Sequence, residues 1–163
     1  IGLPGETKQD IADARQFLKT INANWFHIFC ANPLVGSEMF EICKEKNYLR
    51  NQHVDSDYKK AIVETEDFTA EYIQEMAYRM NLELNFVKNS DLHLGNYSVA
   101  LKGFENAIKA KNDHAFAYYF ASRCYKKLCQ PEKADDYFNQ AKKIIAEQLF
   151  WRNYAEMFLL QLV

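Results

Sequence analysis

A 34-residue spacing between similar residues constrains this chain more than any other feature. Two antiparallel helices approach closely only where a small residue admits the partner's backbone, and an aromatic ring fills the adjacent space. A small–aromatic–small pattern that recurs at a fixed period is typical of stacked helical hairpins. We therefore predict a helical repeat over residues 81–147. The recurring pairs are Ala100 and Ala134, Phe104 and Phe138, and Ala107 and Ala141.

The composition is that of a folded protein with one ordinary domain or two small ones. The chain has 163 residues, of which 48% are hydrophobic and 26% charged. Only 5 Gly and 3 Pro argue against an all-β meander, which needs many turn residues. With a net charge of −2 the chain has no overall electrostatic attraction to nucleic acid, although residues 100–152 hold ten basic and six acidic side chains.

No apolar run is long enough to span a membrane, and we expect no signal peptide, because the first residues lack its basic and apolar regions. The four cysteines match no zinc or redox spacing, so we expect reduced thiols in a cytoplasmic protein. We expect neither nucleic acid nor membrane as a partner. The cysteines are Cys30, Cys43, Cys124 and Cys129.

The sequence pattern of residues 1–50 predicts a small βαβα unit. Thr7 caps a helix whose apolar face runs to Ile21, with Asp10 completing a capping box. The continuously apolar run 25–31 predicts a strand buried on both faces, and Ser37 caps a second helix that ends near Lys46.

For the rest of the chain we predict a linker over residues 51–67 and a helical domain over residues 68–163. One short extended stretch is expected within the linker, at 61–63. Thr69 caps the first helix between the staple residues Phe68 and Ile73, and Gly95 ends the segment as a C′ glycine.

The repeat resembles the tetratricopeptide (TPR) family. Leu94-Gly95-Asn96-Tyr97-Ser98-Val99-Ala100 is similar to that family's turn and second-helix start, and Tyr118, Ala121, Ser122 and Tyr125 match the next first helix. Asn112, Lys88 and Cys129-Gln130-Pro131 depart from the pattern. The resemblance implies a mainly α fold of TPR-like hairpins, an α-solenoid of about two repeats plus a C-terminal helix. An unrelated helical bundle is the alternative.

The resemblance also implies a concave side on which such proteins commonly hold peptides. An aromatic and basic groove there suits an acidic peptide or a C-terminal carboxylate. Otherwise the repeats act as a scaffold. The apolar segment 147–163 is expected to cap the repeats, with dimerisation through this helix as the alternative. The predicted peptide-binding residues are Asn85, Asn89, Phe116, Tyr119, Arg123, Lys126 and Lys127.

The N-terminal unit resembles the last part of the radical S-adenosylmethionine barrel, in the branch that carries a cobalamin-binding domain. Ile1-Gly2-Leu3-Pro4-Gly5-Glu6-Thr7 is similar to a turn after a late barrel strand, and Asn32-Pro33-Leu34-Val35-Gly36-Ser37 to the loop after the next. The resemblance implies a βαβα remnant of the barrel over residues 1–50.

In that family the first turn lies near the adenine of S-adenosylmethionine. The resemblance therefore implies cofactor-side residues Gly2, Leu3, Pro4, Gly5 and Glu6. The C-x-x-x-C-x-x-C loop that ligates a four-iron four-sulfur cluster is missing, so we expect this chain to be inactive by itself. S-adenosylmethionine, the cluster and cobalamin would belong to the parent enzyme.

Other chemistry-bearing residues favour structural roles. His27 lies in an apolar run, Ser37 lacks a nucleophile elbow, and the acidic residues of 55–67 indicate a solvated linker. Two functions remain open. The chain is either the C-terminal region of a radical S-adenosylmethionine enzyme with a TPR-like tail, or a free-standing helical adaptor that binds a protein partner.

Overall fold

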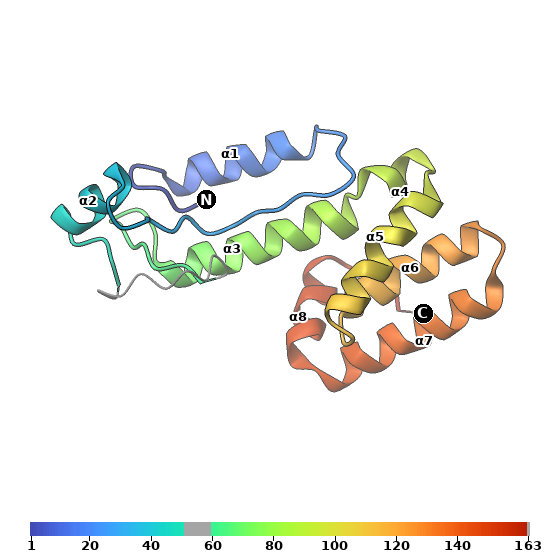
Figure 1. The fold of residues 1–163 in the computed structure, drawn as a ribbon. Coiled ribbons are helices and arrows are strands. Elements are labelled where there is room, and N and C mark those ends of the chain that lie inside the picture. Colours follow the sequence, from blue (N-terminus) through green and yellow to red (C-terminus); the bar gives the residue numbers. More distant parts are fainter. Residues whose placement is uncertain (51–59, 163) are drawn as a thin grey trace. The chain divides into compact units, whose positions relative to one another are not determined.

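The computed structural model describes residues 1–50 and 60–162, which are mainly helical and contain no β-strand (Figure 1). The predicted mainly α fold is thus confirmed. The chain divides into two compact units. Unit 1 comprises Ile1–Ile21 and His27–Asn81, and unit 2 comprises Asn22–Phe26 and Leu82–Val163. This division differs from the expected one, because most of the helix that starts at Ala70 groups with the N-terminal residues.

The helices of unit 1 begin where the sequence predicts. They are α1 (Lys8–Leu18), α2 (Glu38–Glu45) and α3 (Ala70–Leu82, its last residue in unit 2). Thr7 and Asp10 form the predicted capping box, and the Ser37 side chain accepts from the Phe40 amide. The Thr69 hydroxyl likewise accepts from the amide of Tyr72, at 3.2 Å.

The predicted strand at 25–31 is wrong, because within residues 1–50 and 60–162 no strand lies beside this segment to form a ladder. In unit 1 the Ile28 amide donates to Asn81 Oδ1 at 3.1 Å, and Asn81 Nδ2 donates to the Ile28 carbonyl at 2.7 Å. A helix side chain therefore satisfies backbone groups that a neighbouring strand would satisfy in a sheet. Nor is the segment buried on both faces, since Phe29 is 53% exposed.

Ile1 forms two main-chain hydrogen bonds of the kind that join parallel strands in a βαβ unit. Its amino group donates to the Phe29 carbonyl at 2.9 Å, and its carbonyl accepts from the Ala31 amide at 2.8 Å. Bonds to residues on either side of one position are the parallel pattern. Two such bonds do not make a sheet, and residues 1–50 do not form the predicted two-stranded βαβα unit.

The turn after Ile1 depends on two glycines with positive φ, Gly2 at 91° and Gly5 at 87°. The Glu6 carboxylate folds back to accept from the amides of Gly2 and Leu3, at 2.5 and 3.1 Å. A Cβ on Gly2 would lie 2.8 Å from Ile73 Cγ2, whereas one on Gly5 would meet nothing within 4 Å. Gly2 thus allows the turn to contact α3.

The expected linker is only partly described, since 51–59 lie outside the described residues. Its predicted extended stretch is present, because Val63 forms an antiparallel bridge with Leu49. Ala61, Ile62 and Val63 are all buried. The end of the expected linker is therefore part of the core of unit 1.

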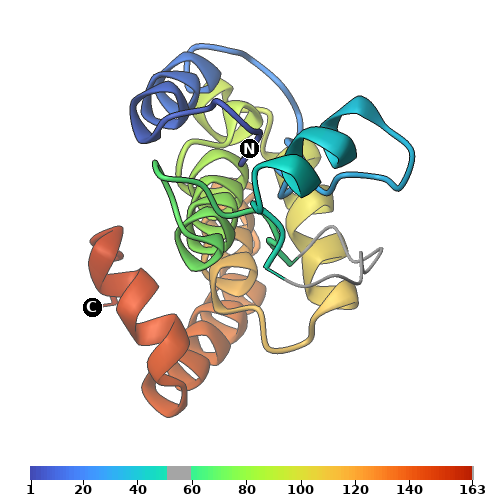
Figure 2. The ribbon, with the colours of Figure 1, turned by 90° about the vertical axis from the view of Figure 1, so that its left-hand side faces the viewer.

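Unit 2 is built of helices joined by short connections. After the π-helical turn η1 (Glu83–Val87) come α4 (Ser90–Leu94), α5 (Tyr97–Ala110), α6 (Ala115–Lys127), α7 (Pro131–Glu147) and α8 (Leu149–Met157). Helix α5 packs on α6, and α6 on α7, which lie side by side in Figures 1 and 2. Helices α5 and α7 begin 34 residues apart, so Ala100 and Ala134 each occupy the fourth position of a helix, and both are buried.

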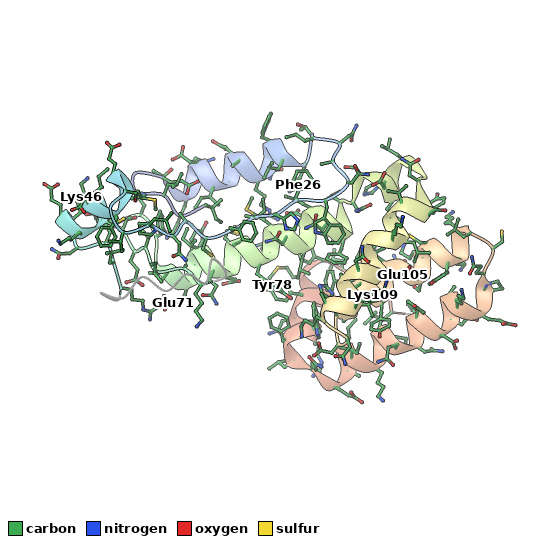
Figure 3. The ribbon with its side chains drawn as sticks, in the orientation of Figure 1. Phe26, Lys46, Glu71, Tyr78, Glu105 and Lys109 are labelled. Carbon is green, nitrogen blue, oxygen red and sulfur yellow. The ribbon has the colours of Figure 1, made fainter. Side chains whose placement is uncertain are left out.

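Aromatic rings form the core of unit 2, with Phe86 of η1 at their centre. Its ring centroid lies 5.5 Å from that of Phe104 on α5, and 6.4 and 6.3 Å from those of Phe116 and Phe120 on α6. Helices α5 and α6 are also joined by a hydrogen bond, which the Tyr125 hydroxyl of α6 donates to Glu105 of α5 at 2.5 Å. Figure 3 shows Glu105 on α5. The rings therefore join the π-helical turn to the hairpins.

The two glycines of the first turn provide a matched test of the packing. Gly5→Ala should lower the free energy of unfolding by about 1 kcal/mol, through the positive φ alone. Gly2→Ala adds the clash with Ile73 and should cost about 2–4 kcal/mol. Urea denaturation followed by circular dichroism measures both, and equal losses would contradict the close approach.

The His114 imidazole caps α6, since Nδ1 accepts from the Ala117 amide at 3.2 Å. The ring lies between Phe86 and Trp151, at centroid distances of 4.8 and 4.7 Å. Burial lowers the pKa of His114 from 6.5 to about 4. At neutral pH the His114 ring is therefore uncharged in the folded protein, and only the uncharged ring can accept a hydrogen bond from the Ala117 amide.

Acidification should destabilise unit 2 through this side chain. Between pH 6.5 and 4 the unfolded state binds more protons at His114, so the free energy of unfolding falls as the pH falls. The loss between pH 7 and 5 should be about 2 kcal/mol. His114→Asn keeps a capping side chain without titrating in this range and should flatten the pH profile, whereas an unchanged profile would contradict the assignment.

Candidate peptide-binding site

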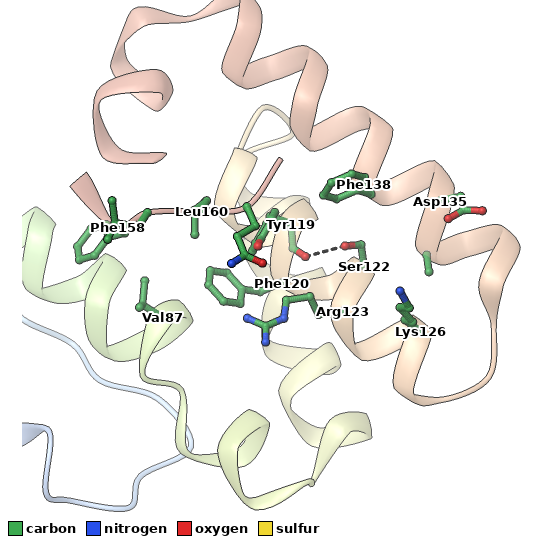
Figure 4. A pocket seen from close by; sticks show the side chains of 13 residues that line it. Val87, Tyr119, Phe120, Ser122, Arg123, Lys126, Asp135, Phe138, Phe158 and Leu160 are labelled. Carbon is green, nitrogen blue, oxygen red and sulfur yellow. Dashed lines mark hydrogen bonds between the residues drawn. The ribbon is translucent and has the colours of Figure 1, made fainter. Parts of the chain in front are cut away.

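A pocket of about 610 Å³ lies in unit 2 between α6, α7 and the segment after α8 (Figure 4). Helix α6 contributes Tyr119, Phe120, Ser122, Arg123 and Lys126 to its lining, and α7 contributes Ala134, Asp135 and Phe138. Residues 158–161 and Val87 complete it. The pocket thus combines aromatic surface with charged groups.

Helical spacing places the α6 residues on one face. Tyr119, Arg123 and Lys126 follow at intervals of four and three residues, which stack side chains along a helix. The Ser122 hydroxyl is bound within the helix, donating to the Tyr119 carbonyl at 2.7 Å (Figure 4). Opposite them, α7 begins at Pro131, a favourable first helical residue, and contributes Asp135 and Phe138 to the pocket lining.

The electrostatic character of the pocket comes from two cations and one carboxylate. Arg123 and Lys126 are exposed, and within residues 1–50 and 60–162 neither forms an ion pair. The Arg123 guanidinium lies 5.7 Å from the centroid of the Phe120 ring, a cation–π distance. Asp135 is the acidic lining residue. Both cations remain available to an anionic ligand.

Aromatic side chains form the floor between these charges. Tyr119 is 7% exposed, and its ring lies 5.0 Å from that of Phe120 and 6.1 Å from that of Phe138. An apolar floor with a few charged groups at its edge suits a peptide that presents both an apolar and an acidic side chain.

The structure brings together three of the predicted peptide-binding residues, Tyr119, Arg123 and Lys126. Lys127 is exposed on α6 but does not line the pocket. Phe116 is fully buried, with its ring 5.8 Å from those of Trp151 and Phe158. We therefore assign Phe116 to the core and leave Lys127 out of the site.

The two predicted asparagines lie elsewhere in unit 2 and are buried. Asn89 caps α4, because its Oδ1 accepts from the Leu92 amide at 2.9 Å and its Nδ2 donates to the Asn85 carbonyl. Asn85 binds main-chain atoms of Phe26, at 2.7 Å through Oδ1 and 2.9 Å through Nδ2. Asn85 thus already holds an extended segment, which is this chain's own.

Sequence reasoning missed the segment after α8. Leu159 has a positive φ of 53°, and the Leu160 amide donates to the Ala155 carbonyl at 2.9 Å, so the chain turns at the helix end. Phe158, Leu160 and Gln161 thereby reach the pocket. The apolar composition of residues 157–160 indicates that this segment packs against other residues, but it does not indicate in which direction the chain turns after α8.

The residues expected on the cofactor side form the turn of unit 1. Gly2 is buried against Ile73, Leu3 and Gly5 are exposed, and Pro4 is half-buried. The Glu6 carboxylate is bound within the turn itself. The described residues gather no group of three or more His, Cys, Asp or Glu side chains that could hold a metal ion.

All four cysteines are free thiols, and only Cys129 is exposed. Burial raises the pKa of Cys124 to about 12, so this thiol stays protonated at neutral pH. In the described part of the chain, no helix has the length and apolar character needed to cross a membrane.

Comparisons with protein-family models, curated proteins and solved structures gave no match to this chain.

Proposed function

We propose that this chain is the C-terminal region of a radical S-adenosylmethionine enzyme, without catalysis of its own, and that unit 2 is a TPR-like module that binds an extended acidic peptide. The pocket with Arg123 and Lys126 above an aromatic floor is the observation that carries the binding function. The two halves of the proposal rest on different residues and have separate tests.

The repeat register supports the TPR-like assignment. Helices α5 and α7 begin at Tyr97 and Pro131, 34 residues apart, and the recurring alanines Ala100 and Ala134 are both buried. The helices pack in chain order, α5 on α6 and α6 on α7, as helical hairpins do in a repeat array.

Two features of unit 1 support the barrel assignment. The turn Gly2–Glu6 has two glycines with positive φ and is closed by its own carboxylate, which holds the backbone in one conformation. The two hydrogen bonds between Ile1 and residues 29–31 have the parallel pattern and α1 lies between them in the chain, which is the order of elements in a βαβ unit although no sheet forms. On this proposal the parent enzyme supplies the cluster, S-adenosylmethionine and cobalamin.

Charge and shape support an acidic peptide as the ligand. An extended chain offers carboxylates at alternate positions along one side, and α6 presents two cations one turn apart. Bidentate binding of a carboxylate by the Arg123 guanidinium and a point charge from Lys126 would fix the peptide, while Tyr119 and Phe138 contact its apolar side chains.

Charge reversal in the pocket should abolish this binding. Arg123→Glu with Lys126→Glu should weaken the binding of an acidic peptide at least 30-fold, because two attractions become repulsions. Lys127→Glu makes the same chemical change on the same helix outside the pocket and should change the affinity less than threefold. Titration calorimetry at two salt concentrations measures both variants, and equal losses would contradict the site.

The coding sequence that precedes Ile1 tests the enzymatic half. A C-x-x-x-C-x-x-C motif upstream in the same reading frame would support the radical enzyme. A start codon directly before Ile1 would contradict it. In that case the free-standing adaptor is the better function, since every lining residue of the pocket belongs to unit 2.

A further inference from the structure

The segment Asn22–Phe26 belongs to unit 2, although the residues on both sides of it belong to unit 1. It has no regular secondary structure, bends at Asn24, and none of its five side chains is fully buried. It thus lies on unit 2 as a bound peptide lies on its receptor.

The main chain of this segment is bound by one side-chain amide. Asn85 Oδ1 accepts from the Phe26 amide at 2.7 Å, and Asn85 Nδ2 donates to the Phe26 carbonyl at 2.9 Å. These two bonds reproduce those that a neighbouring β-strand makes in a ladder. With the segment in place Asn85 is buried, and 3% of its surface is exposed.

Two polar side chains of unit 2 form hydrogen bonds with the two residues before Trp25. The Ala23 amide donates to Ser90 Oγ at 3.3 Å, and Asn24 Nδ2 donates to Asp91 Oδ2 at 2.8 Å. Asp91 is itself buried, and its other oxygen accepts from Asn96 Nδ2 at 3.1 Å. A carboxylate held in this way selects a donor, so an amide fits opposite it and an acid does not.

The Trp25 ring occupies a space beside Gly103 of α5, which has no side chain to fill it. It lies edge-on to Phe86 at a centroid distance of 5.4 Å and 6.5 Å from Phe104. A Cβ at Gly103 of α5 would come within 2.9 Å of the indole, so glycine is needed for the ring to lie there. Aromatic anchors in such slots dominate the affinity of peptide interfaces.

We infer that unit 2 contains a second peptide site, which recognises an extended peptide with Asn followed by Trp and which this chain fills with its own Ala23–Phe26. The determinants are Asn85 for the main chain, Asp91 for the asparagine and the slot above Gly103 for the tryptophan. This site shares no residue with the Arg123 pocket, so it does not depend on the acidic-peptide function. In the resting protein the covalently linked segment excludes a free peptide by its high effective concentration.

A matched pair of variants of the full chain tests the site. Asn24→Asp places a second carboxylate opposite Asp91 and should release the cis segment. Asn22→Asp makes the same change two residues earlier, at an exposed side chain. The probe is a fluorescein-labelled peptide of residues 21–28, Ile-Asn-Ala-Asn-Trp-Phe-His-Ile, followed by fluorescence anisotropy.

The peptide should bind Asn24→Asp at least tenfold more tightly than it binds the wild type or Asn22→Asp. The same peptide with Trp replaced by Ala should bind none of the three proteins. Adding Gly103→Leu to Asn24→Asp should abolish binding again, because the slot is closed. Circular dichroism verifies that the helices remain, and Trp25→Ala replaces Asn24→Asp if that variant loses them.

Equal binding of the peptide to Asn24→Asp and Asn22→Asp, or its absence from both, would overturn the inference. Equal binding of the Trp and Ala peptides would overturn it too, because the slot above Gly103 would then select nothing. Loss of acidic-peptide binding is a separate outcome that concerns only Arg123 and Lys126.

Discussion

Packing around the Phe86 ring is the interaction on which unit 2 depends. This one side chain contacts the rings of Trp25, Phe104, His114 and Phe120, which come from an extended segment, two helices and a helix cap. Aromatic pairs at these distances add about 0.5–1.5 kcal/mol each beyond their buried area. Since Phe86 lies in the π-helical turn, these ring contacts hold the irregular backbone there against the core of unit 2.

The two proposed peptide sites lie where the hairpins meet this core. On one side Gly103 leaves room for a ring from outside the helices, and Asn85 offers its amide to a main chain. On the other side α6 turns Tyr119 and Arg123 toward α7, which leaves open space lined with charge. The same helical packing thus gives one filled and one open groove, each with its own chemistry.

Local signals in the sequence predict where several of the helices begin, but not the π-helical turn η1 or the separate helix α4. Thr7, Ser37 and Thr69 cap helices as expected, because capping depends on residues within one turn. The recurring alanines predict α5 and α7, since a small residue at a helix contact is a local requirement. Tyr119 and Arg123 could be placed together for the same reason, as they lie one turn apart on one helix.

The remaining features depend on contacts between distant residues, which no local pattern encodes. The run 25–31 has the composition of a buried strand, but Asn81 and Asn85 take the hydrogen bonds that a strand would make. Phe116 has the same spacing as the pocket residues, yet its ring turns toward Trp151. Neither preference can be predicted without knowing which side chains of α3, η1 and α8 are near.

The bidentate contact of Asn85 also determines which substitutions position 26 tolerates. Because the Asn85 amide forms these two hydrogen bonds with the main chain of Phe26, they do not depend on which side chain stands at position 26. Proline is the exception, since its nitrogen carries no hydrogen to donate. Natural diversification of this stretch should therefore be broad at residue 26 and narrow at its two predecessors.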